Sequence, residues 1–265
     1  MFRRAAKHAL YLADRLVPVP DGVTILIYHR VGAGTESEVD LPVETFKAQL
    51  AYLAEHADVI TLDAALDRLD PPDDRRSVVV TFDDGTTDFN DHALPALVEL
   101  SIPATLYVAT KFVDEGVRFP WDAPPMTWDG VREAESTGLV TIGSHTHTHA
   151  LLDRVDATTV DDELDRSVSL IAEHTASRPE HFAYPKAVSG SSVADTQVRR
   201  RFRSASLARS RVNRPGGSDR HRLWRTPVQR SDTPTMFARK ACGGMRLEGE
   251  ARELAARARY RRATS

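Results

Sequence analysis

The chain contains a single cysteine, Cys242, among 265 residues. One thiol excludes an internal disulfide framework and any zinc cluster built on several cysteines. Any metal that the protein binds must therefore be held by histidine, aspartate or glutamate. The sequence also lacks an apolar run as long as a membrane-spanning helix. Its hydrophobic share of 41% and charged share of 28% are ordinary for a globular chain, which excludes a disordered or fibrous protein.

Aromatic residues are scarce, at 7% of the chain, and the charge is unevenly distributed. Residues 199–265 hold 19 Lys and Arg against 5 Asp and Glu, whereas residues 1–198 hold 16 against 33. A basic segment of this kind can attract phosphate groups, nucleic acid or an anionic membrane. Because only four aromatic residues (Phe202, Trp224, Phe237 and Tyr260) accompany the 19 Lys and Arg of this segment, fewer than a nucleic-acid stacking surface requires, we expect a solvated surface and no nucleic-acid partner.

The first residues combine basic and apolar side chains. An apolar stretch over 9–13 follows several basic residues, but Asp14 and Arg15 interrupt it before it reaches the length of a signal-peptide core. We therefore predict an amphipathic helix within residues 1–20 and a cytoplasmic protein. A helix packed on the domain is the first interpretation, and a peripheral contact with a membrane surface is the alternative.

Apolar β-rich runs alternate with helical patterns along the chain, which is typical of a parallel sheet with helical crossovers. About seven such units predict an α/β fold. We expect a (β/α) barrel, which can be incomplete, and a doubly wound open sheet is the alternative. We expect one barrel domain over 21–245 and a basic helix over 246–265. The expected strands are 24–28, 77–82, 104–108, 139–143, 181–184, 203–207 and 223–228, and the expected helices between them are 44–54, 62–69, 91–100, 127–137, 157–175 and 191–200.

Three of these strands end in residues that can bind a metal or transfer a proton. His29 follows the first strand, Asp83 and Asp84 follow the second, and residues 144–149 (Ser-His-Thr-His-Thr-His) follow the fourth. In parallel α/β folds, the chemistry lies at the carboxyl ends of the strands. The sequence therefore predicts that these side chains converge on one face.

Asp83 and Asp84 are adjacent carboxylates after an apolar strand, and Gly85 permits a sharp turn behind them. Burying two carboxylates side by side is costly unless a cation compensates. An exposed acidic turn is the alternative interpretation, but the hydrophobic strand immediately before the pair argues against it.

His145 and His149 are four residues apart, so on a helical turn both imidazoles would share one face, as in zinc-binding helices. If the segment were extended instead, His147 would share that face and become the rival ligand. Two imidazoles and one carboxylate leave positions open for water and substrate, which is typical of a catalytic metal site.

Residues 81–85 (Thr-Phe-Asp-Asp-Gly) and 145–149 resemble the first and second motifs of the NodB-homology polysaccharide deacetylases, and residues 182–185 resemble the third. The resemblance covers roughly residues 23–230. It implies a distorted (β/α) barrel that removes acetyl groups from N-acetylated sugars with a divalent metal, usually Zn²⁺, with Co²⁺, Ni²⁺ and Mn²⁺ as alternatives. Carried over by position, it implies that Asp83 is the general base and that the metal ligands are Asp84, His145 and His149.

Two departures from the family pattern affect the other catalytic residues. Ala183 stands where many relatives carry an arginine that pairs with the base, and we expect Arg225, in preference to Lys186, to replace it. The late Leu-x-His segment that supplies the acid in many relatives is absent. His29 is therefore the candidate acid, with a structural hydrogen bond at the barrel mouth as an equal alternative.

Tyr184 and Pro185 are the candidate substrate-binding residues. We expect the backbone N–H of Tyr184 to stabilise the oxyanion of the tetrahedral intermediate. The ring of Tyr184 is also the first candidate for stacking on a sugar, and Trp121 is the second.

The leading hypothesis is thus a metal-dependent carbohydrate N-deacetylase. A catalytically weak sugar-binding or scaffold protein in a glycan-assembly pathway is the alternative, motivated by the two departures. A third hypothesis is a deacetylase for a small, nucleotide-linked or lipid-linked sugar, which the basic C-terminal third favours because linked sugars carry phosphate. The sequence leaves the oligomeric state open.

Overall fold

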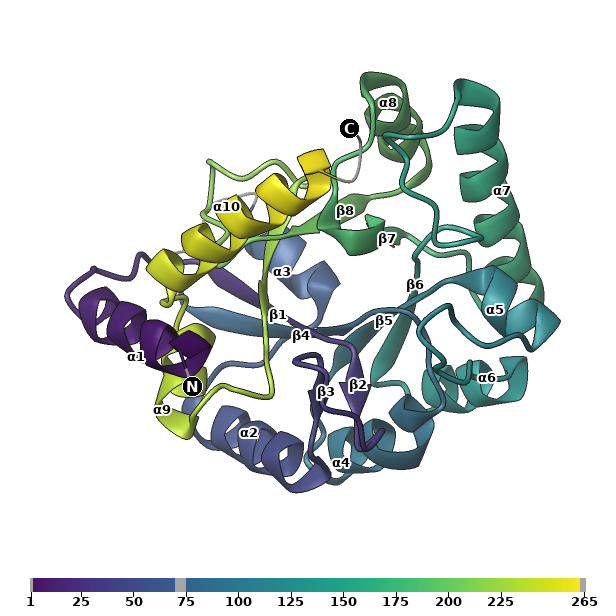
Figure 1. Ribbon diagram of the computed structural model, residues 1–265. Helices are drawn as coiled ribbons and strands as arrows, with labels where there is room; N and C mark the ends of the chain where they lie inside the picture. The colour runs from purple at the N-terminus through teal and green to yellow at the C-terminus, as the bar shows by residue number, and fades with distance from the viewer. Residues whose placement is uncertain (1, 70–74, 263–265) are drawn as a thin grey trace.

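The computed structural model describes residues 2–69 and 75–262. Its main feature is a closed barrel of seven parallel strands surrounded by helices (Figure 1). The expected (β/α) barrel is therefore confirmed, and the open sheet is excluded. In order around the barrel, the strands are β1 (Val23–Tyr28), β4 (Ser77–Phe82), β5 (Ala104–Val108), β6 (Val140–Ser144), β7 (His181–Ala183), β8 (Ser204–Ala208) and β9 (Leu223–Pro227).

The strands are paired so that their carboxyl ends meet at one face of the barrel. Tyr28 at the end of β1 lies opposite Phe82 at the end of β4, and Val108 of β5 lies opposite Ser144 of β6. β1 and β4 are buried along their whole length, which explains their uninterrupted apolar sequences. The residues that follow these strands, His29 and Asp83 among them, consequently share one rim.

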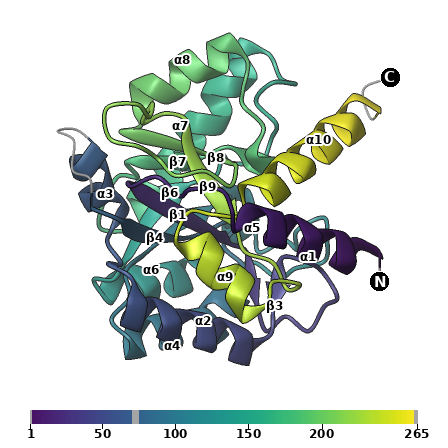
Figure 2. The ribbon, with the colours of Figure 1, turned by 90° about the vertical axis from the view of Figure 1, so that its left-hand side faces the viewer.

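Helices cover the outside of the barrel (Figures 1 and 2). The helix expected at 91–100 begins as a π-helical turn and continues as an α-helix. Two short helices after β5 and β9 were not predicted, because six to eight residues carry too little periodicity. The helices are α2 (Val43–His56), α3 (Leu62–Leu69), η1 (Phe89–Ala93), α4 (Leu94–Glu99), α5 (Thr110–Glu115), α6 (Trp128–Ser136), α7 (Ala157–His174), η2 (Pro185–Ala187), α8 (Ser192–Arg201) and α9 (Pro234–Ala241).

A small parallel sheet, β2 (Arg30–Val31) with β3 (Asp40–Leu41), follows β1 at the rim. Asp88 links it to the segment after β4, because its carboxylate accepts hydrogen bonds from Arg30 Nε at 3.2 Å and from the Val31 N–H at 2.7 Å. This buried link fixes the chain directly after His29 relative to the chain after Asp84.

The first and last helices, α1 (Phe2–Asp14) and α10 (Arg246–Arg262), lie beside each other and project from the barrel (Figure 2). The fully buried carboxylate of Asp14 joins them by accepting hydrogen bonds from the N–H groups of Met245 and Arg246, both at 2.7 Å. α1 thus packs on the domain through the buried side chains of Lys7 and Asp14, whereas Leu12 on the helix and Leu16 just after it remain exposed.

Within the described part of the chain, no helix combines the length and apolar character needed to cross a membrane. A peripheral contact through α1 stays a prediction. The side chains of residues 2–4, which contribute to that prediction, lie outside the described side chains.

Candidate metal centre

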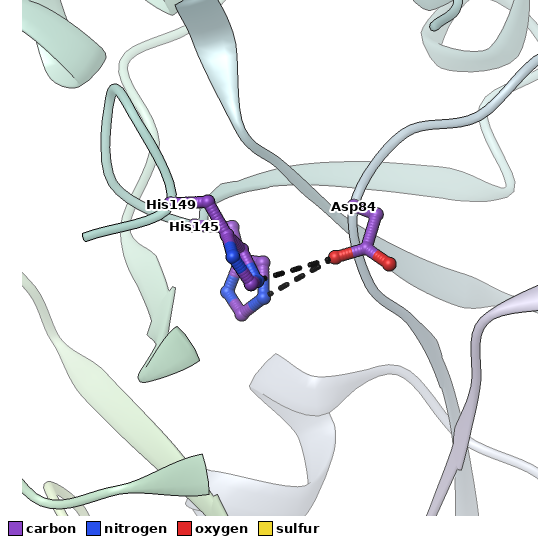
Figure 3. A group of neighbouring side chains, drawn as sticks. All are labelled: Asp84, His145 and His149. Carbon is purple, nitrogen blue, oxygen red and sulfur yellow. Dashed lines mark ion pairs between the residues drawn. The ribbon is translucent and has the colours of Figure 1, made fainter. Parts of the chain in front are cut away.

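Three side chains from two strand ends converge at the rim of the barrel. Oδ1 of Asp84 lies 3.7 Å from Nε2 of His145 and 3.5 Å from Nε2 of His149 (Figure 3). One ligand atom of each residue lies within 4.8 Å of the other two, and no second group of His, Cys, Asp or Glu among the described residues has this geometry. The two histidines and the aspartate named from the sequence are therefore brought together.

Three residues in the two segments that carry these side chains have a left-handed backbone, which is uncommon for residues other than glycine. The φ angle is 77° at Asp84, 65° at Thr146 and 61° at His149. Residues 145–149 are accordingly neither helical nor extended, so both conformations considered for this segment are wrong. Each such residue costs about 1–3 kcal/mol, and residues of this kind cluster at functional sites.

His147 faces away from this cluster. Its Nδ1 lies 3.0 Å from the hydroxyl of Thr110 on α5, and its side chain is buried there. The backbone N–H groups of His147 and Thr148 donate to Oε2 of Glu163 on α7, at 3.0 and 2.8 Å. Glu163 therefore holds the bend between the two clustered histidines. Sequence reasoning missed it, since a glutamate within an amphipathic helix carries no signal of that role.

The protonation of the histidines suits metal binding. Nδ1 of His145 donates to the carbonyl oxygen of Ala183 at 2.7 Å, which leaves the Nε2 lone pair directed at Asp84. Burial lowers the pKa of His145, and it lowers the pKa of His149 to about 3, so both rings are neutral at neutral pH. Neutral imidazoles are the form that ligates metals.

Among the described residues, no Lys or Arg forms an ion pair with Asp84, whose ion-pair partners are His145 and His149. Burial, followed by repulsion from Asp83, raises the pKa of Asp84 to about 8. A buried carboxylate beside two neutral imidazoles is the donor set of an open divalent-metal site. The residues present therefore fit a divalent metal.

Asp83 has a different environment although it is adjacent in sequence. Arg225 on β9 donates to both of its oxygens, from Nη1 to Oδ1 at 2.6 Å and from Nη2 to Oδ2 at 2.9 Å. Burial alone would raise the pKa of Asp83, but the charge and hydrogen bonds of Arg225, together with the neighbouring His145 and His29, outweigh burial and lower the pKa to about 2. Arg225 thus makes the contact that the sequence assigned to it in place of an arginine at Ala183. Lys186, the other candidate, is exposed.

His29 lies close enough to Asp83 and His145 for their charges to affect its pKa. Burial, the largest effect, lowers that pKa to about 4, although the charge of Asp83 acts in the opposite direction. Nδ1 of His29 is buried and makes no hydrogen bond to any described residue. The structural hydrogen bond considered as its alternative role is therefore absent at that nitrogen.

The role assigned to the Tyr184 backbone is wrong. Its N–H donates to the carbonyl oxygen of Ser206 in the β7–β8 pairing at 3.1 Å, so it is not available to an oxyanion. Tyr184 is 1% exposed and packs edge-on against Phe182, which also prevents its ring from meeting a sugar. Pro185 is buried and has no N–H. The next donor along the chain is the N–H of Lys186, which bonds to no other described residue.

Residues 70–205, just over half of the chain, match the family model described as polysaccharide deacetylase. The chain belongs to the polysaccharide deacetylase family. This finding confirms the resemblance seen in the motifs at 81–85 and 145–149. A search of curated proteins finds no match.

Solved structures of deacetylases resemble this family member over most of its length. IcaB from Ammonifex degensii is 26% identical, with a TM-score of 0.74 over 85% of this chain and 97% of IcaB. The deacetylase PplD from Streptococcus pyogenes, determined in complex with acetate, is 18% identical, with a TM-score of 0.74 over 84% of this chain and 99% of PplD. A de-N-acetylase from Aggregatibacter actinomycetemcomitans is 18% identical, with a TM-score of 0.70 over 82% and 99%. At 18% identity, the latter two show likeness of fold alone.

Polysaccharide deacetylases of this kind generally use a divalent metal. In this member, the side chains of Asp84, His145 and His149 are the group that could bind one. The family and the IcaB match support a hydrolase that deacetylates carbohydrate.

Proposed function

We propose that this protein removes acetyl groups from N-acetylated sugars with a divalent metal, zinc, held by Asp84, His145 and His149. The observation that carries the proposal is the approach of both Nε2 atoms to one oxygen of Asp84, beside the paired carboxylate of Asp83. A metal at this position would supply Lewis-acid polarisation of the amide carbonyl and a water of lowered pKa. Co²⁺, Ni²⁺ and Mn²⁺ accept the same donor set.

Asp83 would act as the general base. Its low pKa keeps the carboxylate ionised at neutral pH, and Arg225 fixes its orientation through two hydrogen bonds. Each carboxylate oxygen retains a further lone pair that can accept a proton from the attacking water. The contribution of Asp83 is thus mainly one of position, because a base with so low a pKa is intrinsically weak.

His29 and Lys186 would complete the site. His29 is neutral at neutral pH, so its ring can take up a proton and return it to the nitrogen of the departing amine. The N–H of Lys186 is the donor that we propose for the oxyanion, since the N–H of Tyr184 is engaged by Ser206.

The alternative of a catalytically weak sugar-binding protein was motivated partly by Ala183. The pairing of Arg225 with Asp83 removes that reason, so we favour the enzyme. For the substrate, we propose an N-acetylated polysaccharide or oligosaccharide, with a lipid-linked or nucleotide-linked sugar as the variant suited to a cytoplasmic protein.

The proposal is tested by measuring bound metal and acetate release together. The native protein is assayed with polymeric, oligomeric and phosphate-linked N-acetyl sugars after loading with Zn²⁺. We expect about one metal per chain and acetate release from at least one sugar class. Purified protein that binds none of the four metals would contradict the proposal. A protein that binds metal and sugar but releases no acetate would favour the scaffold alternative.

A further inference from the structure

Trp121 is an exposed aromatic side chain beside the candidate metal centre. It is the one aromatic among the large hydrophobic side chains that the described part of the chain leaves exposed, at 42%. Its ring meets that of His149 at 66°, with ring centroids 5.5 Å apart. The contact thus joins Trp121 directly to one of the three side chains that would hold the metal.

Trp121 packs against a buried stack of two phenylalanine rings. Its indole stacks on Phe119 with centroids 4.9 Å apart, and Phe119 stacks on Phe112 of α5 at 4.2 Å. Phe119 is 2% exposed and Phe112 is 7% exposed, so the stack is anchored in the protein. Phe119 covers one face of the indole and His149 meets it at a steep angle, so the exposed 42% of Trp121 lies on the part of the ring that neither of them covers.

The loop that carries Trp121 is fixed to the segment that follows Asp84. The Met126 N–H donates to the carbonyl oxygen of Gly85 at 2.9 Å, and the Thr87 N–H donates to that of Pro124 at 3.1 Å. Within the loop, the Phe119 N–H donates to the carbonyl oxygen of Ala123 at 2.9 Å. Trp121 is therefore held relative to both segments that supply the metal-binding side chains.

We infer that Trp121 is the sugar-stacking residue of this site, and that its ligand is a pyranose ring of an N-acetylated oligosaccharide. Pyranose rings present C–H groups on their faces, which pack on the faces of aromatic rings. An indole that is partly buried against apolar side chains and partly exposed to solvent suits such a ligand. A rigid support lowers the ordering cost of binding. The contact with His149 brings a stacked ring, and its acetamido group, next to the metal-binding side chains.

This inference rests on the proposed function but names a different feature, the residue that orients the sugar. It also replaces Tyr184, the first sequence-based choice, because that ring is buried. Trp128 provides a matched control, since it stacks on His174 at 4.4 Å and its Nε1 donates to Asp114, away from the candidate metal centre.

Intrinsic fluorescence tests the assignment without turnover. Asp83→Asn chains loaded with Zn²⁺, and carrying Trp121→Phe or Trp128→Phe in addition, are titrated with an N-acetylglucosamine tetramer. We expect a saturable fluorescence change in the Trp128→Phe chain and none in the Trp121→Phe chain. A change that persists in Trp121→Phe, or that is absent from Trp128→Phe, would overturn the assignment.

Kinetics on the otherwise native chain give the second readout. In Trp121→Ala, we expect KM for the tetramer to rise about tenfold with kcat nearly unchanged, as loss of one aromatic contact implies. Trp121→Phe should restore most of the affinity, and the zinc content of both variants should equal that of the native chain. An unchanged KM or a loss of zinc in Trp121→Ala would overturn the sugar-stacking role of Trp121. If the native chain still releases acetate, that result leaves the proposed function intact. Absence of native acetate release would count against the proposed function itself.

Discussion

Arg225 and Asp83 form a two-point ion pair inside the barrel, with donor–acceptor distances of 2.6 and 2.9 Å. The arginine side chain is 0% exposed and the aspartate side chain is 4% exposed. Arg225 also donates to the Leu207 carbonyl oxygen at 3.3 Å and lies over the ring of Tyr107, with Cζ 5.1 Å from the ring centroid. A buried charge is tolerated only when it is paired, so each of the two residues depends on the other.

The first prediction concerns this pair. Arg225→Ala leaves the Asp83 carboxylate buried without its cation, so we expect the free energy of unfolding to fall by about 3–5 kcal/mol and acetate release to fall by at least about 100-fold. Arg225→Lys keeps the charge but not the planar two-point contact, and its activity should lie between those of the native and Ala chains. Urea unfolding and steady-state kinetics measure both effects. Native-like kinetics in Arg225→Ala would show that Asp83 needs no such partner.

The second prediction separates the metal ligands from the base. His149→Ala should lose bound zinc and activity, whereas Asp83→Asn should keep zinc and lose turnover, since His149 belongs to the cluster of Asp84 and His145 and Asp83 does not. His147→Ala is the matched control, because His147 is buried on the same bend but faces Thr110. Metal content by elemental analysis, before and after treatment with a chelator, distinguishes the variants. Equal zinc loss from His147→Ala and His149→Ala would refute the ligand assignment.

The third prediction concerns Glu163, which accepts two backbone hydrogen bonds and the Thr148 hydroxyl at 2.6 Å. Glu163→Ala should loosen the bend between His145 and His149 and weaken zinc affinity by about 10–100-fold, as for other residues that orient metal ligands. Competition with a chromophoric chelator measures the affinity. Glu173→Ala on the same helix is the comparison, and it should bind zinc as the native chain does. If Glu163→Ala also kept native affinity, the bend would not need this support.

The fourth prediction concerns a buried charge cluster at the base of α1. Asp232 lies 2.9 Å from Nζ of Lys240 and 2.7 Å from Nζ of Lys7, and its side chain is 0% exposed. Burial raises the pKa of Asp232, but the two lysines outweigh it and hold the pKa below its ordinary value. The ionised carboxylate therefore stabilises the fold above its unfolded pKa of about 4, and that stability is lost as the pH falls through the lower folded value.

Asp232→Asn should accordingly lower the free energy of unfolding by about 3–5 kcal/mol at neutral pH, because it removes the carboxylate that both buried lysines share and leaves Lys240 only the longer pair with Glu248, at 3.9 Å. Acidification to about pH 3 should cost this variant less than it costs the native chain. Urea unfolding at both pH values provides the measurement. Asp219→Asn, which breaks a partly exposed pair with Arg199, is the control and should change stability by about 1 kcal/mol or less. Equal effects of the two substitutions would show that burial of Asp232 does not matter.

The fifth prediction tests membrane association through α1. Leu12 is 49% exposed and Leu16 is 87% exposed beside basic residues, a combination that favours anionic lipid surfaces. We expect the native chain to cosediment with phosphatidylglycerol vesicles more than with phosphatidylcholine vesicles, and the double variant Leu12→Asp, Leu16→Asp to lose that binding. Val193→Asp, at an exposed site on α8, should bind as the native chain does. No difference between the double variant and this control would remove α1 from consideration.

Local features of the sequence were sufficient for the barrel and for the three clustered side chains. Apolar strands alternating with helices predicted parallel pairing, and Asp84, His145 and His149 follow strands whose carboxyl ends must meet at one rim. The spacing of the histidines left His147 as a rival ligand, and the resemblance to the deacetylases assigned the role to His149. The outcome agrees with the structure, but the backbone there is a left-handed bend held by Glu163.

Other features depended on contacts between distant segments, which no local pattern encodes. The partner of Asp83 lies 142 residues away on β9. From the sequence, either Arg225 or Lys186 could pair with Asp83, and only the closed barrel shows that Arg225 does. The N–H of Tyr184 is used by the neighbouring strand, a pairing that depends on register. Trp121 acquires a role only because its loop is fixed to Gly85 and its ring meets His149. The sequence by itself thus determined which chemical groups stand at the strand ends, because strand periodicity is local. Only the tertiary structure decided which of them touch, because closure of the barrel sets the distances between residues far apart in the chain.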